Sequence, residues 1–255
     1  MILDLLLQLR PVITDAELIR IGPNQDGGYL LPNRLDGITT CFSPGVGQDS
    51  GFEEDLQQKH NIGSHLADGS VDGPAGNLLP LSFLKKHVSD HDDDKNISMD
   101  TWVNQLADTN DNNLLLQMDI EGNEYQVIES MSEETLNRFR IIIIELHNLK
   151  YWIKNPEAGE KFLSKLTKNH YVTSLSPNNF GVFAVLEFAL DEFGPGKIGT
   201  LLMPDVAEIS LIRSDCVIPT GFQTDWPHPL DFPNDPNAPG IPLPNGWPGR
   251  LIIKM

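Results

Sequence analysis

Four consecutive isoleucines at residues 141–144 constrain the fold more than any other part of this sequence. β-Branched side chains favour strands, and a strand that is apolar at every position has to be covered on both faces. Such burial is typical of an inner strand of a parallel sheet, whose crossover helices cover it. The run is too short to cross a bilayer. With 255 residues, 40% of them hydrophobic, the chain is long enough to bury the core that this strand requires.

Strand-like and helix-like patterns alternate along the rest of the chain, which predicts an α/β fold with a parallel sheet and helices on both faces. Helix 123–139 could be one helix or two, and Ser98 or Asp100 is expected to cap helix 98–107. The predicted strands are 38–47, 62–70, 113–122, 140–149, 170–176, 181–190 and 206–214. The predicted helices are 51–60, 98–107, 123–139 and 156–169.

The two ends of the chain differ in character from the middle. Residues 1–37 are expected to be a lead-in that starts with a short amphipathic helix and continues in turns. Residues 38–214 form the predicted α/β domain. Residues 215–255 are dense in Pro, Gly and Asn, which excludes a helix or a central strand there. We expect an irregular tail that is wrapped over the domain or disordered.

Charge and cysteine content narrow the class of partner. The formal net charge is −18 and the pI is about 4.6, which argues against nucleic acid or an anionic membrane as the main partner. The two cysteines, Cys41 and Cys216, do not make a disulfide scaffold, and they favour a reducing compartment. The N-terminus has no basic region typical of a signal peptide. These features predict a cytoplasmic protein, and they leave its oligomeric state open.

Glycines and an acid follow the first two predicted strands of the domain. Gly45 and Gly47 allow a tight turn that a ligand can approach closely. Asp68 comes 21 residues after Gly47, the spacing at which nucleotide-binding folds place an acid on ribose hydroxyls. The alternative is an ordinary strand-to-helix turn, with Asp68 capping the turn that follows it.

More carboxylates and a histidine follow the next two predicted strands. Asp119 and Glu121 end one of them, and Glu145 and His147 end the other. Ligands of open α/β sheets bind beyond the carboxyl ends of the strands, so these groups should share one rim. Asp119 and Glu121 would point to opposite faces if their strand continued. His147 could instead be a hydrogen-bonded structural histidine.

Together these stretches resemble the FkbM-type family of class I S-adenosylmethionine-dependent methyltransferases, over roughly residues 25–210. The most specific stretch is MDIEGNEYQVI, which fits the family's pattern of an apolar strand followed by D-x-E-G-x-E and an aromatic residue. Gln117 departs from the lysine that is common before the aspartate, and Ser176 replaces a histidine of relatives. The resemblance implies a Rossmann-like sandwich with a mostly parallel, seven-stranded sheet.

The resemblance also implies methyl transfer from S-adenosylmethionine to a hydroxyl of a sugar, glycan or natural product. On this reading Ser43, Gly45 and Gly47 hold the methionine portion of the cofactor, and Asp68 accepts hydrogen bonds from its ribose. The partner would be a small-molecule or carbohydrate acceptor.

Three residues are implied for the chemistry. Asp119 and Glu121 would orient the cofactor's amino group or the acceptor, and His147 would take the proton from the hydroxyl. In a variant mechanism Asp119, Glu145 or His147 binds a divalent metal such as magnesium, although no spacing in the sequence demands one.

Two other functions remain open. An NAD-dependent oxidoreductase also uses a glycine-rich turn and an acid, but Ser50 stands at the third glycine position of its motif and Gly51 is one residue late. A catalytically degenerate binding protein would keep the fold without the chemistry, and the serine at position 176 favours that alternative.

Overall fold

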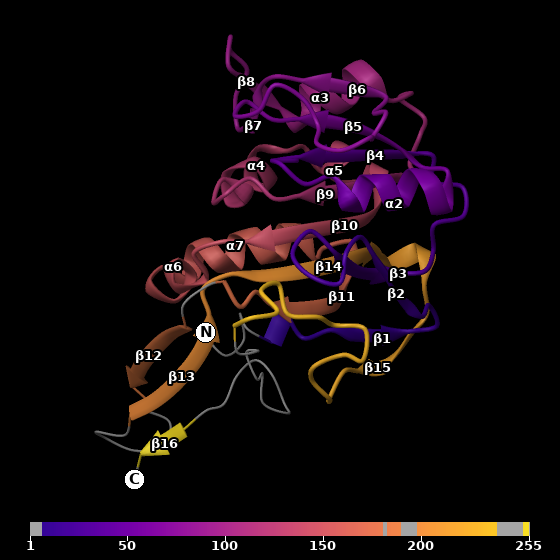
Figure 1. The fold of residues 1–255 in the computed structure, drawn as a ribbon. Coiled ribbons are helices and arrows are strands. Elements are labelled where there is room, and N and C mark those ends of the chain that lie inside the picture. Colours follow the sequence, from indigo (N-terminus) through magenta and orange to yellow (C-terminus); the bar gives the residue numbers. More distant parts are fainter. Residues whose placement is uncertain (1–6, 181–182, 190–197, 239–251, 255) are drawn as a thin grey trace.

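A seven-stranded sheet lies at the centre of the computed structural model, which describes residues 7–180, 183–189, 198–238 and 252–254 (Figure 1). In order across the sheet, the strands are β11 (His170–Pro177), β14 (Ala207–Arg213), β10 (Phe139–Leu146), β9 (Leu114–Met118), β4 (Thr40–Pro44), β5 (Gly63–Ala67) and β6 (Ser82–Leu84). β14 is antiparallel to both neighbours, and all the other neighbouring pairs are parallel. The predicted seven-stranded sheet is thus confirmed as a mixed sheet.

The isoleucine run forms the middle of β10 and contributes to both faces of the sheet. Ile142 and Ile144 are fully buried in the larger apolar cluster, and Ile141 and Ile143 are fully buried in a second cluster on the other face. Alternation along a strand sends successive side chains to opposite faces, so a strand that is apolar throughout fills both clusters.

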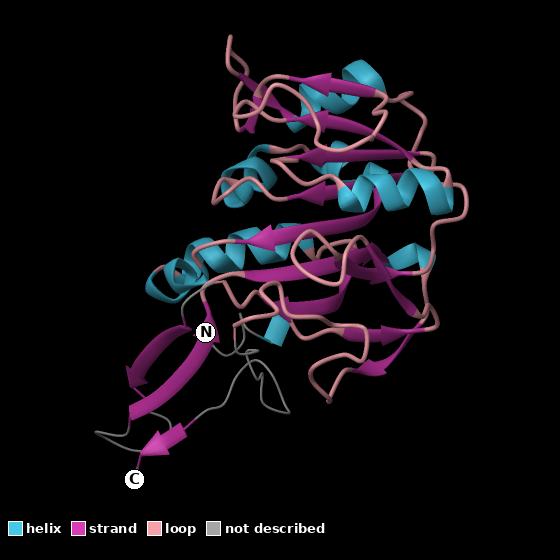
Figure 2. Cartoon of the chain, viewed as in Figure 1, coloured by secondary structure: helices cyan, strands magenta, loops and turns pink. Residues whose placement is uncertain are grey.

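Helices cover both faces of the sheet (Figure 2). The face of Ile142 packs against α3 (Met99–Leu106), α4 (Glu124–Ser130), α5 (Glu133–Arg138), α6 (Leu149–Lys154) and α7 (Pro156–Leu166). The face of Ile141 packs against α2 (Gly51–His60) and the antiparallel pair β2 (Leu18–Ile21) and β3 (Tyr29–Pro32). Within the described residues no helix is long and apolar enough to span a membrane.

Side-chain capping shows which residue caps α3 and whether segment 123–139 is one helix or two. Ser98 caps α3, because its Oγ accepts a hydrogen bond from the backbone N–H of Thr101 at 3.3 Å. Asp100 instead accepts hydrogen bonds from the backbone and side chain of Ser132, which caps α5. The segment 123–139 is therefore two helices, separated at Met131 and Ser132.

Several short strands lie where the sequence pattern was weak. β6 and the parallel pair β7 (His87–Ser89) and β8 (Asn96–Ser98) have three residues each, too few for a periodicity to be read. The acidic run 90–95 joins β7 to β8 and is exposed. A separate sheet contains β12 (Phe183–Ala189), β13 (Ile198–Pro204) and β16 (Ile252–Lys254), and it extends away from the central sheet (Figure 1). β13 and β16 were not predicted.

A strand from the N-terminal part of the chain pairs with a strand from its C-terminal part. β1 (Val12–Thr14) pairs antiparallel with β15 (Pro219–Phe222), which follows the 3-10 helix η2 (Ser214–Cys216). Residues 223–238 contain no helix or strand, and Trp226 packs against the larger apolar cluster. Residues 1–6 of the expected lead-in helix, and residues 239–251 and 255 of the Pro-rich tail, lie outside the described residues. The boundaries at residues 37 and 214 stay predictions.

Candidate active site

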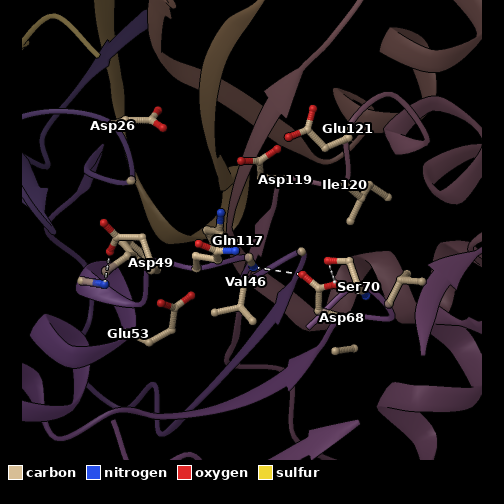
Figure 3. Close-up of a pocket in the computed structure, with 18 of the residues that line it drawn as sticks. Asp26, Val46, Asp49, Glu53, Asp68, Ser70, Gln117, Asp119, Ile120 and Glu121 are labelled. Atoms are coloured by element: carbon tan, nitrogen blue, oxygen red, sulfur yellow. Dashed lines mark hydrogen bonds between the residues drawn. The ribbon is translucent and has the colours of Figure 1, made fainter. Parts of the chain in front are cut away.

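A cavity of about 530 Å³ lies where β4, β5 and β9 end (Figure 3). Its lining comes from the turns that follow these three strands, from residues 26–29, from the start of α2 and from His87 and Val88. The volume is within the range of small-molecule and cofactor sites. The cavity therefore lies where the strand-end rule predicts a ligand site.

Gly45 and Gly47 line this cavity, and each is needed for a different reason. Gly45 has φ +85°, and a Cβ there would lie 1.6 Å from the carbonyl oxygen of Asp119. The turn after β4 thus packs directly against the turn after β9. Gly47 has φ +55°, but a Cβ there would meet nothing within 4 Å. Its backbone faces open space that a ligand can fill.

Asp68 fixes the shape of this glycine turn. Its Oδ2 accepts the backbone N–H of Gly47 at 2.9 Å, and its Oδ1 accepts the N–H and hydroxyl of Ser70 at 2.7 and 2.6 Å (Figure 3). Burial raises the pKa of Asp68, but these hydrogen bonds outweigh burial and hold the pKa below its usual value. An ionised carboxylate has about four lone-pair sites, so Asp68 retains room for a ligand hydroxyl.

Asp119 and Glu121 lie in a turn, because β9 ends at Met118. Glu121 has φ +57° and Gly122 has φ +108°. The expected divergence of the two acids to opposite faces does not apply, since the strand does not continue. Instead both carboxylates approach Nε2 of His147, Asp119 Oδ1 at 3.9 Å and Glu121 Oε2 at 3.5 Å.

The side chain of Glu124 holds this turn in place through hydrogen bonds from its backbone N–H groups. Its side chain is fully buried, and Oε1 accepts the backbone N–H groups of Ile120 at 3.1 Å and Gly122 at 3.0 Å. The same oxygen lies 3.1 Å from Nδ1 of His147. Since Oε1 already acts as an acceptor for two backbone N–H groups, the contact with His147 requires that Nδ1 carry a proton, and Nε2 faces the acids. Tyr125 also donates its hydroxyl proton to the backbone carbonyl of His147.

The titratable groups around His147 have displaced pKa values. Burial raises the pKa of Asp119 to about 7, although the nearby His147 opposes that rise. Burial lowers the pKa of His147, but its hydrogen bond to Glu124 and the charge of that carboxylate outweigh burial and leave the pKa raised. Burial, with the charge of Asp119, also raises the pKa of Glu145 well above its usual range. Such displaced values are common at functional sites.

Two groups of possible metal-binding side chains share Glu145. Donor atoms of Asp119, Glu145 and His147 lie within 4.8 Å of one another, as do those of Asp26, Glu145 and Glu208. Glu145 and Glu208 are register partners across β10 and β14, so two buried carboxyls face each other. The Asn178 amide donates to Glu145 at 2.8 Å.

Ser43 lies apart from the cavity lining. It is fully buried in β4, and its hydroxyl contacts Oε1 of Glu53 and lies 2.7 Å from Oε1 of Gln117. Glu53 and Gln117 do line the cavity. The expected contact between Ser43 and a cofactor stays a prediction, and in this geometry its effect on the cavity passes through these two neighbours.

The Methyltransferase FkbM domain matches residues 15–172, more than half of the chain. The chain belongs to the FkbM methyltransferase family. The match runs from before β2 to within β11 and includes the glycine turn, Asp68 and the Glu124–His147 pair. A search of the curated proteins found no match. Membership confirms the family predicted from the MDIEGNEYQVI stretch.

In this FkbM-family methyltransferase the predicted catalytic residues Asp119, Glu121 and His147 lie together. The predicted cofactor residues Gly45, Gly47, Asp68 and Asp119 line the cavity, and Ser43 does not.

Sequence reasoning missed Asp26, Glu53 and Glu208. Asp26 stands in a turn-rich segment, and Glu53 resembles the usual acid of a helix first turn. Glu208 lies inside an apolar strand, where a charged residue is unusual, and that signal could have identified it.

Proposed function

We propose that this methyltransferase transfers a methyl group from S-adenosylmethionine to a hydroxyl of a sugar, glycan or natural product. The observation that carries the proposal is the charge of the cavity. Six of the described lining residues have a carboxyl group and none is a lysine or arginine; the six are Asp26, Asp49, Glu53, Asp68, Asp119 and Glu121. S-adenosylmethionine presents a sulfonium and an ammonium group, which such a lining attracts.

The same charge argues against a nicotinamide cofactor. Its pyrophosphate needs a helix N-terminus or cationic side chains, but α2 carries Glu54 in its first turn and the described lining residues include no lysine or arginine. A carboxylate near that position repels a phosphate group. The third glycine of the nicotinamide-binding motif would fall at position 50, where this chain has serine, and Gly51 comes one residue later.

The residues present fit the proposed cofactor. The open space beside Gly47 would take the methionine portion, and Asp68 would accept a ribose hydroxyl through its remaining lone pair. Asp119 has a buried Oδ1 without a hydrogen-bond partner among the described residues, and that oxygen can accept from an ammonium group. When bound, S-adenosylmethionine supplies an activated methyl group, so the protein has to position the acceptor and remove its proton.

His147 is the proposed base. Glu124 keeps the proton on Nδ1, which leaves the lone pair of Nε2 free to accept the proton of an acceptor hydroxyl. Glu121 is exposed and lies 3.5 Å from Nε2, so it can orient that hydroxyl from the solvent side. Asp119 lies on the cofactor side of the same nitrogen.

A divalent metal held by Asp119, Glu145 and His147 is the alternative way to activate the hydroxyl. Carboxylate oxygens suit magnesium, whereas an imidazole nitrogen suits zinc or other transition metals better. Nε2 cannot both bind a metal and accept the proton, so the two mechanisms exclude each other. Activity that survives chelator and is unchanged by added magnesium would favour the base.

A degenerate binding protein is the second candidate function. It is favoured by Ser176, which stands at the end of β11 where relatives have a histidine, and whose side chain hydrogen-bonds Asp231. Such a protein would keep the cofactor cavity and lack turnover.

The proposal is tested by transfer of a radiolabelled methyl group from S-adenosylmethionine to a panel of neutral sugars and hydroxylated natural products. We expect product with at least one acceptor and a strong loss in the His147→Gln variant, which keeps a polar side chain without the base. His228→Gln is the matched control, because that histidine lies in the C-terminal segment, where its Nδ1 accepts the backbone N–H of Leu230. Cofactor binding without transfer to any acceptor would support the degenerate protein.

A further inference from the structure

A buried row of polar side chains crosses the floor of the cavity from α2 to β3. Glu53, Ser43, Gln117 and Tyr29 are each at most 5% exposed. Ser43 Oγ contacts Oε1 of Glu53, and it lies 2.7 Å from Oε1 of Gln117. Nε2 of Gln117 then donates to the Tyr29 hydroxyl at 3.2 Å. This row joins one helix and three strands beneath the ligand space.

The number of hydrogens in this row constrains the charge of Glu53. A serine hydroxyl has one proton, yet Ser43 Oγ has an oxygen of Glu53 on one side and an oxygen of Gln117 on the other. If Glu53 were ionised, one of these two contacts would join oxygens with no hydrogen between them. If Glu53 carries a proton, it donates to Ser43, which donates to Gln117.

We propose that Glu53 is a positioning residue for the cofactor, and that it acts as a neutral acid which donates to Ser43 and holds the cavity floor in its binding shape. This inference rests on the proposed function, because the bound molecule is taken to be S-adenosylmethionine or its product. Loss of the proton leaves Ser43 without a donor, so the row rearranges and the cavity loses its binding shape.

The surroundings of Glu53 agree with a neutral acid. Burial raises the pKa of Glu53 to about 7, although the hydrogen bond with Ser43 opposes that rise. The other ionisable groups that face it are Asp49 and Glu54 beside it in the chain, and Cys41 on β4. None of them is a cation, and no ion pair of Glu53 occurs among the residues that the structure describes. The ionised form is favoured only by hydrogen bonds with Ser43 and with the backbone of Glu53 itself, and these do not outweigh burial.

The test is calorimetric titration with S-adenosylhomocysteine across a pH series. Between about pH 6 and about pH 8 we expect the wild-type affinity to fall about tenfold more than that of Glu53→Gln, because the protonated fraction of such an acid falls about tenfold. The amide introduced by Glu53→Gln keeps a donor for Ser43 at every pH. Glu53→Ala removes the donor and should bind weakly throughout. The ligand's own amine titrates near pH 8, but equally for all variants.

Glu160→Gln is the matched control, since it makes the same chemical change at an exposed position of α7 and should behave as wild type. Equal pH profiles for wild type and Glu53→Gln would overturn the proposal, and would mean that Glu53 is ionised and the Gln117 amide is reversed.

If the wild type binds no S-adenosylhomocysteine at any pH, the proposed function fails. The protonation of Glu53 is then tested separately, through the pH dependence of unfolding. Wild type should lose more stability than Glu53→Gln as the pH rises from about 5 to about 8. Equal losses would overturn the proposal in that case too.

Discussion

Glu124 holds the two halves of the candidate site together through a single carboxylate oxygen. That oxygen accepts the backbone N–H groups of Ile120 and Gly122, which shapes the acidic turn, and it also contacts Nδ1 of His147. One buried acid thus fixes both the position of the carboxylates and the tautomer of the proposed base. The sequence motif contains Glu124, but its partners could not be read from the motif, because they come from backbone geometry.

Glu124→Gln should lower the pKa of His147. The Glu124 charge and hydrogen bond raise that pKa, so a neutral amide removes the electrostatic part of the rise. Nε2 therefore loses its proton at a lower pH. The acid limb of any pH–activity profile moves to lower pH with it. NMR titration of the histidine Cε1–H signals measures the shift without an acceptor. Glu129→Gln, a partly exposed acid in the same helix, should leave the titration unchanged. An unaltered His147 titration in Glu124→Gln would refute the pairing.

Asp68→Ala should weaken S-adenosylhomocysteine binding by about 1–3 kcal/mol, the usual cost of leaving polar partners unpaired. That corresponds to roughly 5- to 150-fold in the dissociation constant. Ser70→Ala is the control, because it removes a donor to Asp68 but keeps the carboxylate that faces the cavity. Calorimetry compares the three proteins. If Asp68→Ala bound as tightly as wild type, Asp68 would have no place in the cofactor site.

At the scale of elements, the C-terminal segment is tied to the carboxyl edge of the sheet by one asparagine. The side-chain amide of Asn234 donates to Asp26 Oδ1 at 3.1 Å and to Glu208 Oε1 at 2.5 Å, and the backbone carbonyl of Asn234 accepts the backbone N–H of Asp26 at 3.2 Å. Asp26 lines the cavity. A segment that lies beyond the family match therefore supports one wall of the site.

Asn234→Ala should destabilise the protein by about 1–3 kcal/mol, because it leaves a buried carboxyl of Glu208 without its donor. Urea unfolding measures the loss. Asn237→Ala changes an exposed asparagine of the same segment and should have little effect. Equal stability of the two variants would show that the segment is not held by Asn234.

Which elements could be predicted depended on their length and burial. β9 and β10 have long apolar runs, and α2 and α7 carry clear helical patterns, so the sequence predicts all four. β6, β7 and β8 have three residues each and no readable period. β6 pairs with β5, and β7 pairs with β8, so these strands are held by their pairing and not by a pattern of their own.

At the scale of the whole molecule, burial favours the protonated form of several acids around the site. Burial raises the pKa of Glu53 to about 7 and of Glu208 to about 8, and it is the largest cause of the raised value at Asp119. These groups bind a proton more tightly in the folded protein than in the unfolded chain. The stability they contribute is fully present below their unfolded pKa values, near 4, and is lost as the pH rises towards 8.

We therefore expect the free energy of unfolding to fall steadily from about pH 5 to about pH 8. Urea unfolding at intervals across this range, at constant ionic strength, measures the trend. A free energy that stayed constant or rose would mean that these acids are ionised in the folded protein.

The position of the site in the fold could be predicted from the sequence, but several of the acids that surround it could not. The strand-end rule brought Gly45, Asp68, Asp119 and His147 to one rim, because the topology of a parallel sheet decides where strands end. The acids of the cavity floor and of the C-terminal segment could not be placed. Their role depends on packing between α2, β14 and the segment that follows β15, and no motif spacing encodes it.

The most direct test of the central claim is calorimetric titration of the wild-type protein with S-adenosylhomocysteine at about pH 6.5, where the proposed cavity floor is protonated. We predict a single site with micromolar affinity, and no heat of binding with NADH under the same conditions. A folded protein that bound neither S-adenosylhomocysteine nor S-adenosylmethionine, or that bound NADH instead, would contradict the assignment of this cavity to the methyl donor.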